Sequence, residues 1–177
     1  MKLIGYALAV AAAGSLAACA SIGNPQRRVV GTAAMLSADG QPRGQATLVR
    51  VGERLDLEVN ATGLPAGTLG IHLHAVGRCV PRDFSSAGGH LNPLGRQHGT
   101  MNPMGSHLGD LPNITVDRNG QGSLDVLLEG ARERIMADIF DADGTALVIH
   151  AGPDDYRTDP AGNSGSRIAC GVFTQVR

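Results

Sequence analysis

The sequence is short of lysine, of aromatic side chains and of net charge. Lys2 is its only lysine, tryptophan does not occur, and aromatic residues make up 3% of the 177 positions. The formal net charge of −1 argues against a nucleic-acid-binding protein, which normally carries a basic surplus. Glycine (25) and proline (9) are frequent and indicate many turns. The composition therefore favours one β domain of short strands over a helical bundle.

One apolar run lies at the N-terminus, and no later segment is apolar enough to span a membrane. Residues 3–16 follow a positive start at Lys2 and have the length of a secretory signal rather than of a membrane span. The segment Leu16-Ala17-Ala18-Cys19 resembles a bacterial lipobox, which implies cleavage before Cys19 and a lipid on its thiol. Ordinary secretion is the alternative, because residues 18–20 also satisfy a signal-peptidase site. We expect a lipoprotein signal peptide at 1–18, a lipidated tether at 19–28 and one folded domain at 29–177.

Short segments with strand-like patterns fill the rest of the chain. In residues 53–61, Leu55, Leu57 and Val59 alternate with polar residues, as in a half-buried strand. Two stretches, 77–113 and 151–166, lack such a pattern and are rich in glycine and proline, which predicts long functional loops. No segment is a convincing helix. The pattern predicts an all-β antiparallel sandwich or barrel with strands at 29–38, 45–51, 53–61, 70–76, 114–116, 123–128, 135–140, 146–150 and 167–176.

Histidine is the residue type that points to chemistry. The chain has six, and five of them lie on one predicted strand and in the long loop that follows it. His72 and His74 are two residues apart on that strand, so both side chains leave the same face. Imidazole and carboxylate ligands suit zinc and copper, so this set favours a metal site over histidines scattered by chance. The candidate ligands are His72, His74, His90, His98, His107, His150 and Asp110, although Asp110 also lies in a good turn sequence.

Six motifs together resemble those of the copper–zinc superoxide dismutases. The resemblance covers about residues 29–176. It implies an eight-stranded Greek-key barrel that dismutes superoxide to dioxygen and hydrogen peroxide with a redox-cycling copper and a structural zinc. The motifs are Gly70–His74 (GIHLH), Ser86–Pro93 (SAGGHLNP), His98–Gly99 (HG), His107–Asn113 (HLGDLPN), Leu147–His150 (LVIH) and Gly165–Gly171 (GSRIACG).

The resemblance also assigns a role to each matching residue. His90 becomes a bridge between the two metals and a carrier of a proton. Arg167 lies beside copper and binds the anion, unless it is only a solvated arginine at a strand end. Asp154 orients one ligand of each metal, unless it is an exposed loop aspartate. The implied copper ligands are His72, His74, His90 and His150, and the implied zinc ligands are His90, His98, His107 and Asp110.

The resemblance further implies a disulfide between Cys79 and Cys170. That pairing would leave Cys19 as the odd thiol of three in an oxidising compartment, and lipidation would use it. Because Ala20 is not an inner-membrane retention aspartate, we expect a cell-envelope protein anchored in the outer membrane and facing the periplasm. The sequence leaves open whether the chain is a monomer or a homodimer.

Three other functions remain as alternatives. The first is a copper- and zinc-binding envelope protein without dismutase activity, against which the complete ligand set and Arg167 both count. The second is a zinc hydrolase, which needs a general base, yet no glutamate occurs between Glu58 and Glu129. The third is a structural lipoprotein, which six matching motifs make a poor explanation.

Overall fold

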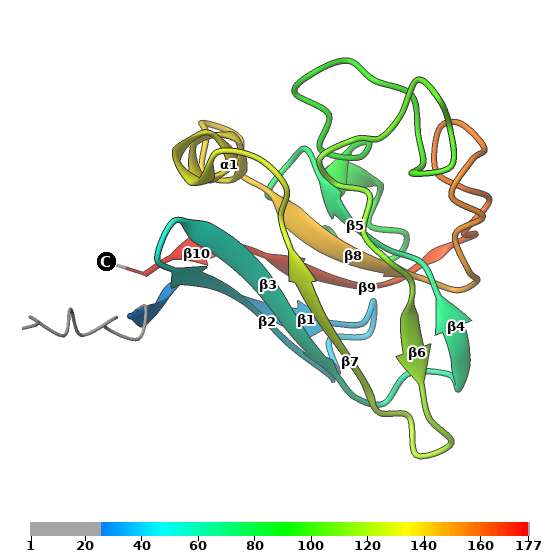
Figure 1. Cartoon of the computed structure of the whole chain (residues 1–177). Coiled ribbons are helices and arrows are strands. Elements are labelled where there is room, and N and C mark those ends of the chain that lie inside the picture. Colours follow the sequence, from blue (N-terminus) through cyan, green and yellow to red (C-terminus); the bar gives the residue numbers. More distant parts are fainter. Residues whose placement is uncertain (1–25, 177) are drawn as a thin grey trace, which may run out of the picture.

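The computed structural model describes residues 26–176, which form one antiparallel sheet curled into a nearly closed barrel (Figure 1). The strands follow the order β4-β6-β7-β3-β2-β1-β9-β8-β5, and β10 pairs with β1. The two ends of this order, β4 and β5, are separated in the chain only by Gly70, so the sheet returns to where it starts. The strands are β1 (Arg27–Leu36), β2 (Pro42–Val51), β3 (Arg54–Ala61), β4 (Gly67–Leu69), β5 (Ile71–His74), β6 (Ile114–Val116), β7 (Gly122–Leu127), β8 (Ala146–His150), β9 (Arg167–Val172) and β10 (Thr174–Gln175).

The all-β prediction is confirmed, but the sheet has ten strands, whereas the pattern predicted nine and the resemblance implied eight. The short β4 was not expected, and the last predicted strand, 167–176, divides into β9 and β10. β1 begins at Arg27, so the first strand starts inside the segment that we expected to be tether. None of these differences involves a candidate metal ligand, because β4, the start of β1 and the division between β9 and β10 all lie outside the ligand residues.

The strand predicted at 135–140 is wrong: this segment belongs to the helix α1 (Arg132–Ile139). Ile135 and Ile139 are both buried, and Met136 and Phe140 pack against the same core, which is the four-residue spacing of a helix face. Arg134 Nε donates to the Asp138 carboxylate (3.0 Å), a pairing between successive turns. The alternation of Ile135, Ala137 and Ile139 indicated a strand because so short an apolar run fits both the two-residue repeat of a strand and the 3.6-residue repeat of a helix. No helix among residues 26–176 is long and apolar enough to cross a membrane.

The main core lies inside the barrel, and β5 forms part of its wall. Ile71 and Leu73 point into this core and are fully buried, while His72 and His74 alternate with them and point to the other side. All four residues of β5 are nevertheless buried, because the predicted long loops cover the outer side of this wall. The first loop begins at residue 75 rather than 77, because β5 ends at His74, and the two loops, 75–113 and 151–166, lie next to one another (green and orange in Figure 1).

The first loop is fastened along the free edge of β5. Leu73 N donates to Gly109 O (3.0 Å), Leu91 N donates to Leu73 O (2.8 Å), and single bridges join His72 to Asp110 and His74 to His90. A Cβ at Gly109 would lie 2.2 Å from Leu73 O, so only glycine permits this close approach. The loop residues His90 and Asp110 are thereby brought beside the two strand histidines.

Candidate metal centre

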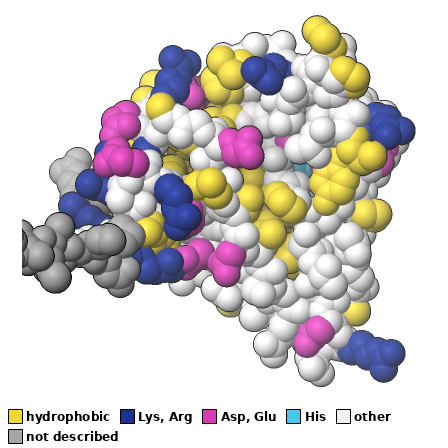
Figure 2. Space-filling model, in the orientation of Figure 1, with side chains coloured by type: hydrophobic (Ala, Val, Ile, Leu, Met, Phe, Trp, Pro, Cys, Tyr) yellow, Lys and Arg dark blue, Asp and Glu magenta, His cyan; other side chains and the backbone are white. Residues whose placement is uncertain are grey.

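Six buried histidines gather beneath the two loops. His72 and His74 come from β5, and His150 comes from the end of the neighbouring β8. The loop residues His90, His98 and His107 close over them, with 9% or less of each residue exposed. Figure 2 accordingly shows almost no histidine on the face that it presents. The structure brings together every histidine that the sequence predicted as a ligand.

The first group consists of His72, His74, His90 and His150, whose ligand atoms all lie within 4.8 Å of one another. In the described part of the chain, each of these rings has one buried nitrogen without a hydrogen-bond partner: Nδ1 of His72 and Nε2 of the other three. Unpaired buried polar atoms are rare and costly, and four of them in one place need an explanation. A metal ion held by the four lone pairs supplies it, and an all-imidazole set suits copper.

The opposite nitrogen of each strand histidine is held by an acceptor. Nδ1 of His74 donates to Gly88 O (2.9 Å), and Nδ1 of His150 donates to Gly165 O (3.2 Å). Nε2 of His72 donates to Asp154 Oδ2 (3.0 Å). A nitrogen that donates in this way fixes the tautomer, so the lone pair is left on the nitrogen that faces the group.

The second group consists of His90, His98, His107 and Asp110. The Nδ1 atoms of the three histidines lie 2.8, 3.0 and 3.0 Å from one oxygen, Oδ1 of Asp110. The other oxygen, Oδ2, accepts from the backbone N–H groups of Gly99 (2.8 Å) and His107 (3.0 Å), which fixes the carboxylate. Three imidazoles and one carboxylate that converge in this way fit a four-ligand zinc site.

His90 belongs to both groups. Its Nδ1 faces Asp110, whereas its Nε2 is the unpartnered atom among the first four histidines. The ring centroid of His90 lies 4.0 Å from that of His72 on one side and 5.5 Å from that of His107 on the other. One imidazole is therefore placed to serve two ions at once.

Asp154 connects the two groups through hydrogen bonds to one histidine of each. Its Oδ2 accepts from His72 Nε2 (3.0 Å), and its Oδ1 accepts from His98 Nε2 (2.9 Å). The residue is buried, with 3% of its surface exposed, so the alternative of an exposed loop aspartate does not hold. A Cβ at Gly162 would lie 1.7 Å from Asp154 Oδ1, so glycine is required beside this carboxylate.

Two residues that the sequence did not single out hold Asp154 in turn. The side-chain amide of Asn113 makes two hydrogen bonds to the Asp154 backbone, donating to its carbonyl oxygen (2.9 Å) and accepting from its N–H (2.8 Å). The N–H of Tyr156 donates to Asp154 Oδ1 (2.7 Å), and its hydroxyl accepts from Asn113 N (2.7 Å). Asn113 ends one of the motifs quoted above, but its contact is set by the fold and not by its neighbours in sequence.

Burial and hydrogen bonding give the histidines of the two groups different pKa values. Burial lowers the pKa of His74 to about 2 and those of His90 and His150 to about 4, so these rings are neutral and can act as ligands. Burial also disfavours a charge on His98, but the hydrogen bonds to Asp110 and Asp154 outweigh it and raise its pKa to about 9. Burial would raise the pKa values of Asp110 and Asp154 as well, yet their histidine partners hold both well below the usual range.

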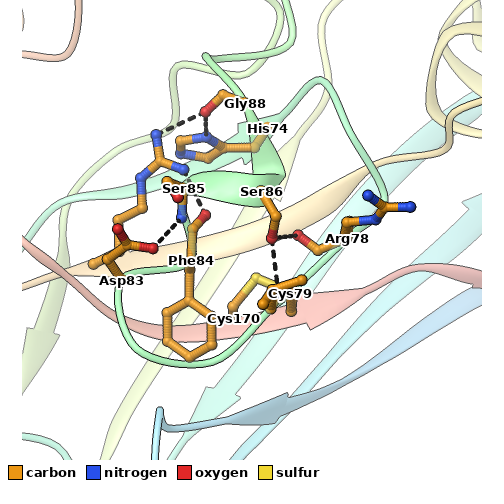
Figure 3. The surroundings of a disulfide bond; sticks show 11 residues. His74, Arg78, Cys79, Asp83, Phe84, Ser85, Ser86, Gly88 and Cys170 are labelled. Carbon is orange, nitrogen blue, oxygen red and sulfur yellow. Dashed lines mark hydrogen bonds between the residues drawn. A yellow bond between two sulfur atoms is a disulfide. The ribbon is translucent and has the colours of Figure 1, made fainter.

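Arg167 lies at the start of β9, half-buried beside the first group. Its Nη1 donates to Phe84 O (2.7 Å), and its Nη2 donates to Gly88 O (2.7 Å). The Gly88 carbonyl also accepts from His74 (Figure 3). Arg167 is therefore more than a solvated strand-end arginine. Nothing in the sequence marked Phe84 as its partner.

A disulfide joins Cys79 of the first loop to Cys170 of β9, with a Cα–Cα distance of 5.8 Å (Figure 3). It ties the loop that carries His90 to the strand that begins with Arg167. Cys19, the predicted lipidation site, lies outside the described residues.

The chain is similar to known proteins over most of its length. A family model described as copper/zinc superoxide dismutase (SODC) matches residues 42–173. "Superoxide dismutase [Cu-Zn] 2" of Aquifex aeolicus is 45% identical over 144 residues, 80% of this chain and 84% of the relative. "Superoxide dismutase-like protein YojM" of Bacillus subtilis is 40% identical over 161 residues, 84% of this chain and 81% of the relative.

Solved structures agree with the sequence comparisons. The crystal structure of a SOD-like protein from Bacillus subtilis aligns with a TM-score of 0.76 and 38% identity, covering 82% of this chain and 99% of that one. The Cu/Zn superoxide dismutase from Brucella abortus aligns with a TM-score of 0.65 and 27% identity, covering 83% and 99%.

Proposed function

Because the chain belongs to the copper/zinc superoxide dismutase family, we propose that it dismutes superoxide in the cell envelope and protects that compartment from oxidative damage. In balanced form, two superoxide anions and two protons give dioxygen and hydrogen peroxide. The observation that carries the proposal is the convergence of four buried, unpartnered imidazole nitrogens, one of them on a ring that also faces a second ligand group.

The two groups differ in the metal that they suit. We assign copper to His72, His74, His90 and His150, and zinc to His90, His98, His107 and Asp110. Held by these four imidazoles, copper would supply the one-electron redox chemistry by which one superoxide loses an electron and another gains it. The carboxylate-containing group suits zinc, which has no redox chemistry and would serve to hold the loop and His90 in place.

Arg167 supplies the positive charge that an anionic substrate needs. Two of its five N–H groups are used by the carbonyls of Phe84 and Gly88, which leaves the others to bind superoxide. A guanidinium fixed in this way requires little rearrangement when the anion arrives. Its charge raises the encounter rate and makes that rate sensitive to salt.

His90 is the residue to which we assign proton transfer. Its Nε2 is buried, faces the copper ligands and has no protein partner among the described residues. Because one lone pair cannot bind a metal and a proton at once, Nε2 would hold the proton only while it is not bound to copper, and it would then present that proton to the reduced substrate. Nδ1, which faces Asp110, keeps the ring oriented throughout.

We further propose that Cys19 carries a lipid that anchors the chain to the outer membrane, facing the periplasm. The lipobox-like residues 16–19 support this, and so does the disulfide, since it uses the other two cysteines. Intact-mass and peptide mass spectrometry of the mature protein provide the test. We expect Cys19 as the first residue, with a diacylglyceryl adduct. A different N-terminus, or a free Cys19 thiol, would contradict the anchor.

The activity is tested by loading the purified protein with both metals and measuring metal content and superoxide dismutation on one sample. We expect one copper and one zinc per chain together with dismutation. Two bound metals without dismutation would instead support the alternative of a copper- and zinc-binding envelope protein.

A further inference from the structure

We propose that Phe84 is a positioning residue for Arg167, and that its buried ring fixes the carbonyl groups that hold the guanidinium beside His74. The inference rests on the proposed function, because it concerns the same anion-binding arginine. It names an aromatic ring, and not the disulfide alone, as the support of that arginine.

The Phe84 ring is an anchor separate from the main core. Only 2% of the residue is exposed, and within residues 26–176 it is the largest of the fully buried side chains. It packs in a small cluster of its own, beside the disulfide (Figure 3). The cluster joins the loop to two strands, because its other members are Ala87 of the loop, Ala146 and Val148 of β8, and Cys170 of β9, with Cys79 packed against them.

The backbone at Phe84 turns its carbonyl oxygen toward Arg167. Phe84 has φ 54° and ψ 22°, a left-handed conformation that is uncommon for a residue other than glycine. Its carbonyl oxygen accepts from Arg167 Nη1 (2.7 Å) and from Ala87 N (3.0 Å). A large buried ring is a direct way to hold this unfavourable conformation in place.

The second carbonyl belongs to the same short segment. The 3₁₀ turn Ser85–Ala87 follows Phe84, and Gly88 N donates back to Ser85 O (3.0 Å), so the segment is compact. Gly88 O then accepts from Arg167 Nη2 (2.7 Å) and from His74 Nδ1 (2.9 Å). An anchor at Phe84 therefore fixes both acceptors of Arg167, and with them its position relative to a copper ligand.

The disulfide reaches the same segment through different contacts. Cys79 lies five residues before Phe84, and the residues on either side of it bond to the 3₁₀ turn, because Ser86 Oγ donates to Arg78 O (3.0 Å) and accepts from Val80 N (2.8 Å). Neither bond involves Phe84 or Gly88, the acceptors of Arg167. Among the described residues, the side chain of Arg167 bonds to Phe84 and Gly88 and not to Cys79. Loss of the ring should therefore release the guanidinium even when the disulfide is intact.

The test measures anion binding separately from turnover. Azide, a univalent anion, is titrated into the copper- and zinc-loaded protein while the absorption of the copper is followed, and metal content is measured on each sample. For Phe84→Ala we expect full metal content and about tenfold weaker azide binding, the effect of losing one charge-assisted hydrogen bond. Phe84→Leu, which keeps most of the apolar volume, should lie between wild type and Phe84→Ala.

A double variant shows whether the effect passes through Arg167. If it does, Phe84→Ala combined with Arg167→Ala binds azide no more weakly than Arg167→Ala alone. Phe173→Ala is the matched control, because Phe173 is a buried phenylalanine of the main core. It should lower thermal stability and leave azide binding unchanged.

Two results would overturn the inference: unchanged azide affinity in a fully metallated Phe84→Ala protein, or additive losses in the double variant. Should Phe84→Ala fail to fold, Phe84→Leu decides by the same two criteria. A failure of the proposed function would look different. The wild-type protein, fully metallated and able to bind azide, would then not dismute superoxide.

Discussion

Replacing Asp154 by asparagine tests the link between the two metal sites. The carboxylate accepts from His72 and His98, and the backbone N–H of Tyr156 shares its Oδ1. Asparagine offers one accepting oxygen and one NH₂ group, so one of the two imidazole N–H groups must face a donor. The change removes the negative charge beside the His72 and His98 rings, and it deprives one of these rings of the acceptor that orients it.

The two rings should not suffer equally. His72 lies on β5, where the strand ladder holds its backbone on one side and the loop covers it on the other. His98 lies in the loop, and in the described part of the chain its ring is held only by Asp110 and Asp154. We therefore expect zinc affinity to fall about 10–100-fold, the usual cost of losing a partner behind a metal ligand, and copper affinity to fall less. This range corresponds to about 1.4–2.8 kcal/mol.

Competition with a chelator of known affinity measures both constants on the purified variant. Asp155→Asn is the matched control, because this neighbouring carboxylate is exposed and bonds to Thr158 and Asn163 instead of to a histidine. Wild-type zinc affinity in Asp154→Asn, or an equal loss in Asp155→Asn, would refute the reasoning.

Four other perturbations test the remaining parts of the site. His90→Ala should uncouple the two metals and abolish most activity, and full activity would refute the bridge. Arg167→Ala should keep both metals but lower kcat/KM about tenfold and flatten its dependence on ionic strength, whereas unchanged kinetics would remove it from the mechanism. Changing both Cys79 and Cys170 to serine should lower the free energy of unfolding by up to about 4–5 kcal/mol in denaturant titrations of the metal-free protein; no change would argue against constraint by the bond. Because His98 has a pKa of about 9 in the metal-free protein, zinc binding at pH 7 should release about one proton, and fewer protons should be released as the pH rises above 9. Calorimetry in buffers of different ionisation enthalpy measures the number of protons released, and zero release at pH 7 would contradict the prediction.

Much of the candidate site could be predicted because its chemistry depends on rare residues. Six histidines in 177 positions are few enough that their spacing carries information, and the alternation in β5 places His72 and His74 on one side. Most strands were predictable for a different reason: residues in a barrel wall alternate between the core and the exterior, and the sequence shows that alternation. Copper and zinc followed from the ligand types together with the family resemblance.

The parts that were missed depend on contacts between distant segments. The sequence of α1 predicts a strand because Ile135 and Ile139 fit the spacing of a strand as well as that of a helix. Only the packing of their neighbours Met136 and Phe140 on the core distinguishes the two. Asn113 holds the Asp154 backbone across 41 residues of chain, and Phe84 meets Arg167 across 83 residues. Neither contact leaves a local pattern, because a side-chain amide or a backbone carbonyl can meet many partners in a sequence.

The attachment of the first loop along β5 also affects how the protein behaves toward other copies of itself. A strand edge with unpaired N–H and C=O groups invites pairing with another chain. In this barrel the edge of β5 is occupied by Gly109 and Leu91 from the loop that carries His90 and Asp110. The segment that organises the metal ligands therefore also shields the sheet from intermolecular strand addition, so solubility and metal binding depend on the same stretch of backbone.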